Sequence, residues 1–413
     1  MSMGKDIKIK NKSMIYAEGL VWQKAGSGKI YLGSKDTGKY LLTKPFWRHI
    51  VDILEKPQRI EAIARKMAQR AKRSIPEERA IHKVKIMILL MTKHGLIKKI
   101  DHISFGRDEN RLLPRGTKPL WLKFFFHKLL LTIYVFLACL GLMMIIFSRY
   151  GLPKYADFFW HERLSISLLT FFIFSWIFGI MHELVHYWTA ASQGIRAKIR
   201  LSYRLNFLVF ETYNPDIFSV PKFWRLVIYL SGMVFDLILV FIFYLIIFLF
   251  PNQNLEIIHQ FILIQWLTFL WQFLFFTRTD FYFVIKELVG VENLYTYAIK
   301  KIYSLITRQP FDHYLTRREI FFVNIYTFFF FSGTMFAIVR YSLYHLPITL
   351  KLATSGIGSL YLGYIESNST EFLDGLIIIS IQILAVTLLI YEVLKKYLPR
   401  LTLCPRRDLN PQP

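Results

Sequence analysis

Residues 164–190 read LSISLLTFFIFSWIFGIMHELVHYWTA, and this stretch indicates the class of protein. Its apolar part matches the roughly 20 residues with which a helix crosses a hydrocarbon core of about 30 Å. Near its end stand His182, Glu183 and His186. Because ionisable groups are costly at membrane depth and are usually functional there, we predict a transmembrane helix that carries a reactive cluster.

Five more apolar stretches of similar length occur, at about 124–147, 226–250, 257–276, 320–339 and 375–393. Of the 413 residues, 54% are apolar and 17% aromatic, which excludes a disordered chain and argues against a single water-soluble domain. The chain has two cysteines, too few for a disulfide framework. The predicted fold class is mainly α: a six-helix polytopic membrane protein with a small N-terminal α+β domain.

The distribution of Lys and Arg predicts the orientation, because these residues mark the cytoplasmic side of short membrane loops. Loops 191–225 and 277–319 carry six and seven of them, whereas 251–256 carries none and 341–374 carries one. We therefore expect a multi-pass protein of the cell membrane with both termini in the cytoplasm. Up to residue 120 the chain has 27 Lys and Arg against 11 Asp and Glu. This excess predicts contact with anionic membrane lipid, and no nucleic-acid partner is expected.

The N-terminal part shows the order strand, strand, three helices, strand, which is a winged-helix pattern. The expected strands are 29–33, 39–42 and 96–100, and the expected helices are 43–54, 60–71 and 77–93. The domains predicted along the chain are an N-terminal segment (1–26), the winged-helix domain (27–100), a linker (101–120), a membrane core of four spans (121–294), a region of two spans (295–398) and a tail (399–413). The sequence leaves open whether residues 345–364, between the last two predicted spans, form a re-entrant segment.

The chemistry is concentrated in His182-Glu183-Leu184-Val185-His186, an H-E-x-x-H motif on a helix. Spacing by four residues places both histidines on one face, where their imidazoles can reach one Zn²⁺ ion. Glu183 lies next to that position, suited to take a proton from the attacking water. Zinc needs a third protein ligand, and two aspartates are candidates. Asp280 follows the inward-running fourth span, and Asp236 lies about ten residues into the third span.

The residues around this motif resemble the site-2-type intramembrane zinc metalloproteases, in particular the branch of peptide zinc metalloproteases. The resemblance is carried by 182–194, 213–236 and 277–294. It implies one Zn²⁺ per chain held by His182, His186 and Asp280, with Glu183 as the catalytic base. Asp236, Gly232 and Arg278 are implied as supports of the site. Relatives have Asn-Pro shortly before the aspartate and Gly directly after it, where this chain has Leu274-Phe275 and Phe281.

Residues 27–100 are similar to the small peptide-recognition winged helices of the pyrroloquinoline-quinone-D type. Such domains bind leader peptides of ribosomally made, modified peptides by adding a strand to a sheet edge. Together the resemblances imply a zinc metalloendopeptidase that cleaves a peptide or membrane-associated substrate at the cytoplasmic side, in the maturation of such a peptide. One alternative is a non-catalytic membrane export or immunity component that binds the peptide with a structural metal. Another is a membrane-tethered regulator whose winged helix reads DNA.

Overall fold

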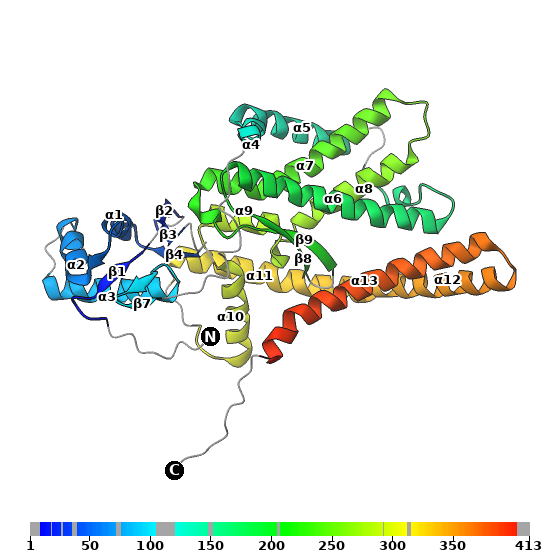
Figure 1. The fold of residues 1–413 in the computed structure, drawn as a ribbon. Coiled ribbons are helices and arrows are strands. Elements are labelled where there is room, and N and C mark those ends of the chain that lie inside the picture. Colours follow the sequence, from blue (N-terminus) through cyan, green and yellow to red (C-terminus); the bar gives the residue numbers. More distant parts are fainter. Residues whose placement is uncertain are drawn as a thin grey trace, which may run out of the picture.

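The computed structural model describes residues 9–402, apart from 18, 26–27, 35–38, 72–75, 105–119, 148–151, 205–206, 292 and 312–314. The chain is mainly helical. A small α+β unit lies at one end of the long helices, and a pair of helices at the C-terminal end of the chain projects from the opposite end (Figure 1). Most of the predicted linker 101–120 and most of the predicted tail 399–413 fall outside the described residues.

The N-terminal unit contains two small sheets and three helices. Strands β2 (Leu20–Lys24), β3 (Ile30–Ser34) and β4 (Lys39–Thr43) form one antiparallel sheet in the order β2-β3-β4. Strand β1 (Met14–Tyr16) joins β5 (Gln58–Arg59), β6 (Lys99–Ile100) and β7 (Ile103–Ser104) in a second sheet in the order β5-β1-β6-β7. The helices are α1 (His49–Ile53, preceded by the 3-10 helix η1, Pro45–Arg48), α2 (Ile60–Gln69) and α3 (Glu77–Lys93).

One apolar core holds this unit together. On α2, Ile60, Ile63 and Met67 recur at helical spacing and are all buried. Ile15 of β1 is fully buried in the same core, and side chains of β2 pack against it. The unit therefore begins before residue 27, the boundary expected from the sequence. Strands as short as β1 have too few residues to show an alternating pattern, so the sequence did not reveal this one.

Within the part of the chain that the structure describes, five helices are long and apolar enough to cross a membrane, which indicates a multi-pass membrane protein. They are α5 (Lys128–Phe147), α6 (Leu164–Ser192), α7 (Lys222–Leu249), a continuous rod over Arg317–Ile365, and the part Ser369–Lys395 of α13 (Ser369–Thr402). The fourth predicted span, 257–276, forms the shorter helix α8 (Glu256–Gln272). At 1.5 Å per residue its 17 residues extend about 25 Å. The chain then turns through the 3-10 helix η5 (Phe275–Thr277) into α9 (Asp280–Val289).

The C-terminal region differs from the expected two spans separated by a loop. After α10 (Leu294–Thr307), α11 (Arg317–Arg340) passes through one π-helical turn, η6 (Tyr341–His345), into α12 (Leu346–Ile365). Residues 345–364 are therefore helical and continue α11 through the π-turn. Pro347, which donates no backbone hydrogen bond, is the second residue after the π-turn, so the irregularity is absorbed inside the helix. Helix α13 then returns along α12, as Figure 1 shows.

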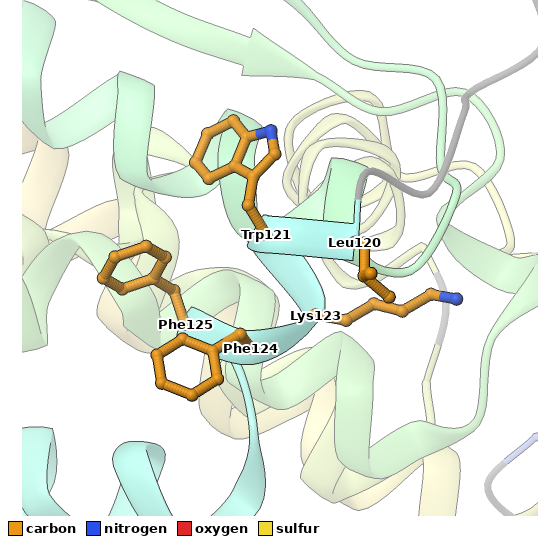
Figure 2. Close-up of a pocket in the computed structure, with 5 residues that line it drawn as sticks. All are labelled: Leu120, Trp121, Lys123, Phe124 and Phe125. Carbon is orange, nitrogen blue, oxygen red and sulfur yellow. The ribbon is translucent and has the colours of Figure 1, made fainter.

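Shorter elements flank the long helices, among them the 3-10 helix η3 (Tyr155–Phe158) between α5 and α6. Between α6 and α7 the chain forms a hairpin of β8 (Lys198–Arg204) and β9 (Phe207–Tyr213), followed by the 3-10 helix η4 (Ile217–Ser219). Before α5, the short helix α4 (Leu120–Phe125) exposes Leu120, Trp121, Phe124 and Phe125 beside Lys123 (Figure 2). Exposed aromatic side chains next to a lysine at the start of a span are typical of the membrane–water interface.

Replacement of Ile15 by Ala tests whether residues before 27 belong to the N-terminal core. Because Ile15 is fully buried, the variant should lose about 2–5 kcal/mol of the stability of this unit. The measurement is hydrogen exchange of α2 and α3 in the full chain. The matched control is Ile103→Ala, at a side chain that is 56% exposed, which should change the same exchange by less than about 0.5 kcal/mol. Equal effects of the two substitutions would contradict the assignment.

Candidate metal centre

Three separate elements bring the predicted site residues together. His182 and His186 lie one helical turn apart on α6, both buried, on the side that packs against α7. Helix α7 supplies Gly232 and Asp236, and α9 begins with Asp280. The two histidines were predictable from local helical spacing. By contrast, Asp280 arrives from a position 94 residues away from His186.

The ligand atoms of three side chains converge on one point. Asp280 Oδ2 lies 3.0 Å from His182 Nε2 and 3.0 Å from His186 Nε2, and the two Nε2 atoms are 3.1 Å apart. A tetrahedral ion with bonds of 2.0–2.1 Å would hold its ligand atoms about 3.3 Å apart. Among the described residues, this is the one group of His, Cys, Asp and Glu side chains placed to hold a metal ion.

The other ring nitrogens fix where the imidazole protons lie. His186 Nδ1 is 2.6 Å from the backbone oxygen of Ile228, which can only accept, so this nitrogen carries the proton. His182 Nδ1 lies 2.8 Å from Asp236 Oδ2 and donates to that buried carboxylate. In the neutral imidazoles, which are the metal-binding form, both Nε2 atoms then carry lone pairs that face Asp280 Oδ2. Three acceptors facing one another repel unless a cation or a proton lies between them, and a metal ion fits this arrangement.

Gly232 leaves room for the cluster. A Cβ atom at this position would lie 2.4 Å from His182 Nε2 and 2.5 Å from His186 Nε2. Real Cβ atoms essentially never approach other atoms so closely. Helix α7 therefore approaches α6 with a residue that has no side chain, at the level where the two imidazoles meet. The geometry fits a supporting role for Gly232 at the site, which stays a prediction.

Asp280 is held by the turn that precedes α9. Its backbone N–H donates to Gln272 Oε1 at 3.2 Å, and Thr279 Oγ1 donates to the Gln272 backbone oxygen at 2.6 Å. Asp280 Oδ2 lies 3.0 Å from both imidazoles, and an oxygen ligand at this point would have to be a carboxylate. Its side chain is 17% exposed, so the cluster is most open on this side.

Arg278 lies in the turn between η5 and α9. Its backbone adopts the left-handed conformation with φ of 61°, and its guanidinium lies 5.4 Å from the centre of the Tyr295 ring. Among the described residues, no hydrogen bond or ion pair joins Arg278 to the cluster. Arg278 therefore shapes the turn before α9, and Asp280 faces the two histidines instead of pairing with it.

Glu183 lies beside the cluster and is oriented by the β8–β9 hairpin. Thr212 Oγ1 is 2.6 Å from Glu183 Oε2 and 3.0 Å from its backbone oxygen. The hydroxyl donates to the carboxylate, which leaves Oε1 available to a proton or a water molecule. Sequence reasoning missed Thr212, because a threonine in a strand 29 residues from Glu183 carries no local signal of its partner.

The two candidate aspartates differ in their positions. Asp280 contributes an oxygen to the converging atoms, whereas Asp236 lies behind His182, on the nitrogen that points away from them. Asp236 is fully buried and corresponds to the carboxylate that commonly orients a metal-bound histidine. The assignment of Asp280 as the third ligand stays a prediction, and the geometry favours it over Asp236.

No family model, no curated protein and no solved structure matches this chain. Function is therefore inferred from the chemistry of the site itself.

Metal content of the detergent-purified protein distinguishes the two aspartates. We expect about one zinc per chain in the wild type and none after His186→Ala or Asp280→Ala, because each removes an atom that faces the ion. Asp236→Asn should keep the metal but bind it about 10–100-fold more weakly, as measured by competition with a chelator. Complete loss of zinc in Asp236→Asn, with zinc retained in Asp280→Ala, would make Asp236 the third ligand instead.

Gly232→Ala should abolish metal binding without unfolding the protein. The new methyl group would collide with both Nε2 atoms and displace the imidazoles. The matched control is Gly179→Ala on α6, where a Cβ would meet its nearest neighbour, Phe210, at an ordinary 3.7 Å. Zinc content and thermal unfolding are measured for both variants. Full zinc content in Gly232→Ala would show that the ion does not lie between these histidines.

Proposed function

We propose that this protein is a membrane-embedded zinc metalloendopeptidase of the site-2 type, which cleaves a peptide or a membrane-associated substrate. The observation that carries the proposal is the convergence of three acceptor atoms from His182, His186 and Asp280, with a carboxylate beside them. Two histidines and one carboxylate form a ligand set found at catalytic zinc sites, in which a fourth position stays open.

Each residue has a separate part in hydrolysis. When bound, Zn²⁺ would supply Lewis-acid chemistry, polarising the scissile carbonyl and making a water molecule more acidic. Glu183 would accept the proton of the attacking water and deliver it to the leaving amine. Thr212 would hold the Glu183 carboxylate in place for both transfers. Asp236 and the Ile228 carbonyl would hold the imidazole protons on Nδ1, so that the Nε2 atom of each histidine keeps its lone pair for the ion.

The β8–β9 hairpin offers a way to present an extended substrate. Strand β9 carries Thr212 against Glu183, and within the described residues β9 pairs with β8 alone. A peptide that adds to the other edge of β9 would run beside the catalytic carboxylate. Strand addition uses backbone hydrogen bonds and therefore suits substrates of varied sequence.

A second position for a peptide lies in the N-terminal unit. A cavity of about 630 Å³ opens between the end of β4, η1, α2 and α3, with Trp47, Met87 and Leu90 in its wall and Lys83 beside them. Strand β4 is an edge of its sheet, and its last residue, Thr43, lines the same cavity. A leader peptide added to β4 could place apolar side chains in the cavity. This supports a role in the processing of a ribosomally made, modified peptide.

The proposed setting is the cell membrane with both termini in the cytoplasm. This orientation rests on the Lys and Arg of the loops. In this orientation the basic N-terminal part, and the aromatic face of α4, would meet the anionic inner leaflet. The C-terminal end of α6, which carries the two histidines, would open toward the cytoplasm.

The test is cleavage by the protein reconstituted in lipid vesicles and incubated with a complex peptide library. New peptide termini, detected by mass spectrometry, should appear with the wild type and be lost with Glu183→Gln, while zinc content is unchanged. Loss of the base is expected to cost at least 10²–10⁴-fold in rate. The matched control is Glu256→Gln, an exposed glutamate at the start of α8, which should cleave as the wild type does.

Cleavage that persists in Glu183→Gln would remove this residue from the mechanism. Zinc binding without any Glu183-dependent product would overturn the peptidase and favour the alternative, an export or immunity component in which the metal is structural. In that case the peptides that bind to the N-terminal unit should be recovered uncleaved.

A further inference from the structure

A buried ion pair lies beneath the candidate metal centre. Arg225 near the start of α7 is completely buried and forms two hydrogen bonds of 2.9 Å with the carboxylate of Glu287 on α9. A third bond of 2.8 Å joins its Nη1 to the Val220 backbone oxygen. A fully buried, doubly bonded pair of charges is costly to remove from water, so its position calls for an explanation beyond packing.

The same guanidinium contacts the N-terminal unit. Its Nη2 lies 3.5 Å from the backbone oxygen of Lys24 in β2, and its centre lies 5.1 Å from the ring of Tyr31 in β3. Tyr31 stacks on Phe218 of η4 at 4.2 Å, between the same sheet and the membrane core. Gln23 Nε2 also donates to the Ser219 backbone oxygen at 3.2 Å. The sheet β2-β3-β4 is thus seated directly on the Arg225–Glu287 pair.

Helical spacing connects this pair to the metal centre. Arg225 precedes Gly232 by seven residues on α7, and Glu287 follows Asp280 by seven residues on α9. Seven residues are two turns, so on each helix the two residues share a face and lie about 10 Å apart along the axis. The ion pair therefore joins α7 to α9 about two turns from the residues with which each helix reaches the histidines of α6. It limits how far α9 can move relative to α7, and therefore where Asp280 lies.

We propose that Arg225 is a positioning residue that sets the place of Asp280 at the metal centre, and that the seated N-terminal sheet holds Arg225 in the conformation that does so. The inference rests on the proposed metal site. The N-terminal unit would then stabilise the metal centre through Arg225, in addition to recognising a peptide. Displacement of the sheet would make α9 more mobile and lower the affinity of the site for zinc.

The experiment compares zinc affinity and hydrogen exchange in the full chain, purified in detergent. The variants are Arg225→Lys, which cannot form the two-pronged bond to Glu287, and Tyr31→Ala and Gln23→Ala, which disturb the seating from the N-terminal side alone. We expect zinc affinity to fall about 10-fold or more in Arg225→Lys and Tyr31→Ala, and less in Gln23→Ala. Amide exchange in α9 should rise in the same order, while exchange in α6 is unchanged.

A spectroscopic signature separates positioning from simple destabilisation. In the Co²⁺-substituted protein, a displaced Asp280 should alter the visible spectrum, which reports coordination geometry, at temperatures where each variant is fully folded. The matched control is Asp374→Asn, which breaks the ion pair between Arg163 and α13 near the start of α6. This variant should leave zinc affinity, α9 exchange and the spectrum as in the wild type.

Each outcome decides the inference independently of peptidase activity. Zinc affinity within twofold of the wild type in both Arg225→Lys and Tyr31→Ala, with an unchanged Co²⁺ spectrum, would overturn it even if the protein cleaves peptides. Weakened binding in these variants would uphold it even if no cleavage is found and the peptidase proposal fails. If the wild type binds no zinc, unchanged α9 exchange in Tyr31→Ala would overturn the coupling and raised exchange would uphold it.

Discussion

The arrangement of two imidazoles in a single protonation pattern is the constraint on which the rest of the site depends. A histidine in an apolar setting can carry its proton on either ring nitrogen, and only one choice leaves a lone pair facing inward. Here the Ile228 carbonyl and Asp236 both hold protons on Nδ1. Once these bonds exist, α7 must lie close to α6, and Gly232 makes that closeness sterically feasible. The same close contact between α6 and α7 therefore both packs the two helices and orients the histidines for metal binding.

The sequence revealed those parts of the site that follow from spacing along one helix or from the depth of a span. His182, Glu183 and His186 belong to a local motif, and Asp280 followed from the direction of the fourth predicted span. The sequence could not separate Asp280 from Asp236, because both approach the same depth and only three-dimensional packing shows which nitrogen each one faces. It could not reveal Thr212 or the Ile228 carbonyl, since a hydroxyl in a hairpin and a backbone oxygen acquire their roles from tertiary contacts.

The same distinction applies to the fold. Long apolar runs gave the positions of α5, α6 and α7 well, because twenty consecutive residues carry a strong hydropathy signal. The five-residue strands β3 and β4 were predicted, but β1, with three residues, carries little signal and was missed although Ile15 is fully buried in the core. The sequence left residues 345–364 undecided for another reason. Only packing shows that Gly363 of α12 and Gly375 of α13 lie against the backbone of the opposite helix.

The continuous rod from α11 to α12 has a mechanical consequence. Its 49 residues extend about 74 Å, more than twice the thickness of a hydrocarbon core of roughly 30 Å. A helix of this length must tilt strongly or extend beyond the hydrocarbon core, and its tilt depends on the thickness of the bilayer. Gly333 of the rod packs directly against the Phe276 ring, three residues before Thr279 and four before Asp280. A change in bilayer thickness that alters the tilt of the rod would therefore move Phe276, and with it the turn that presents Asp280.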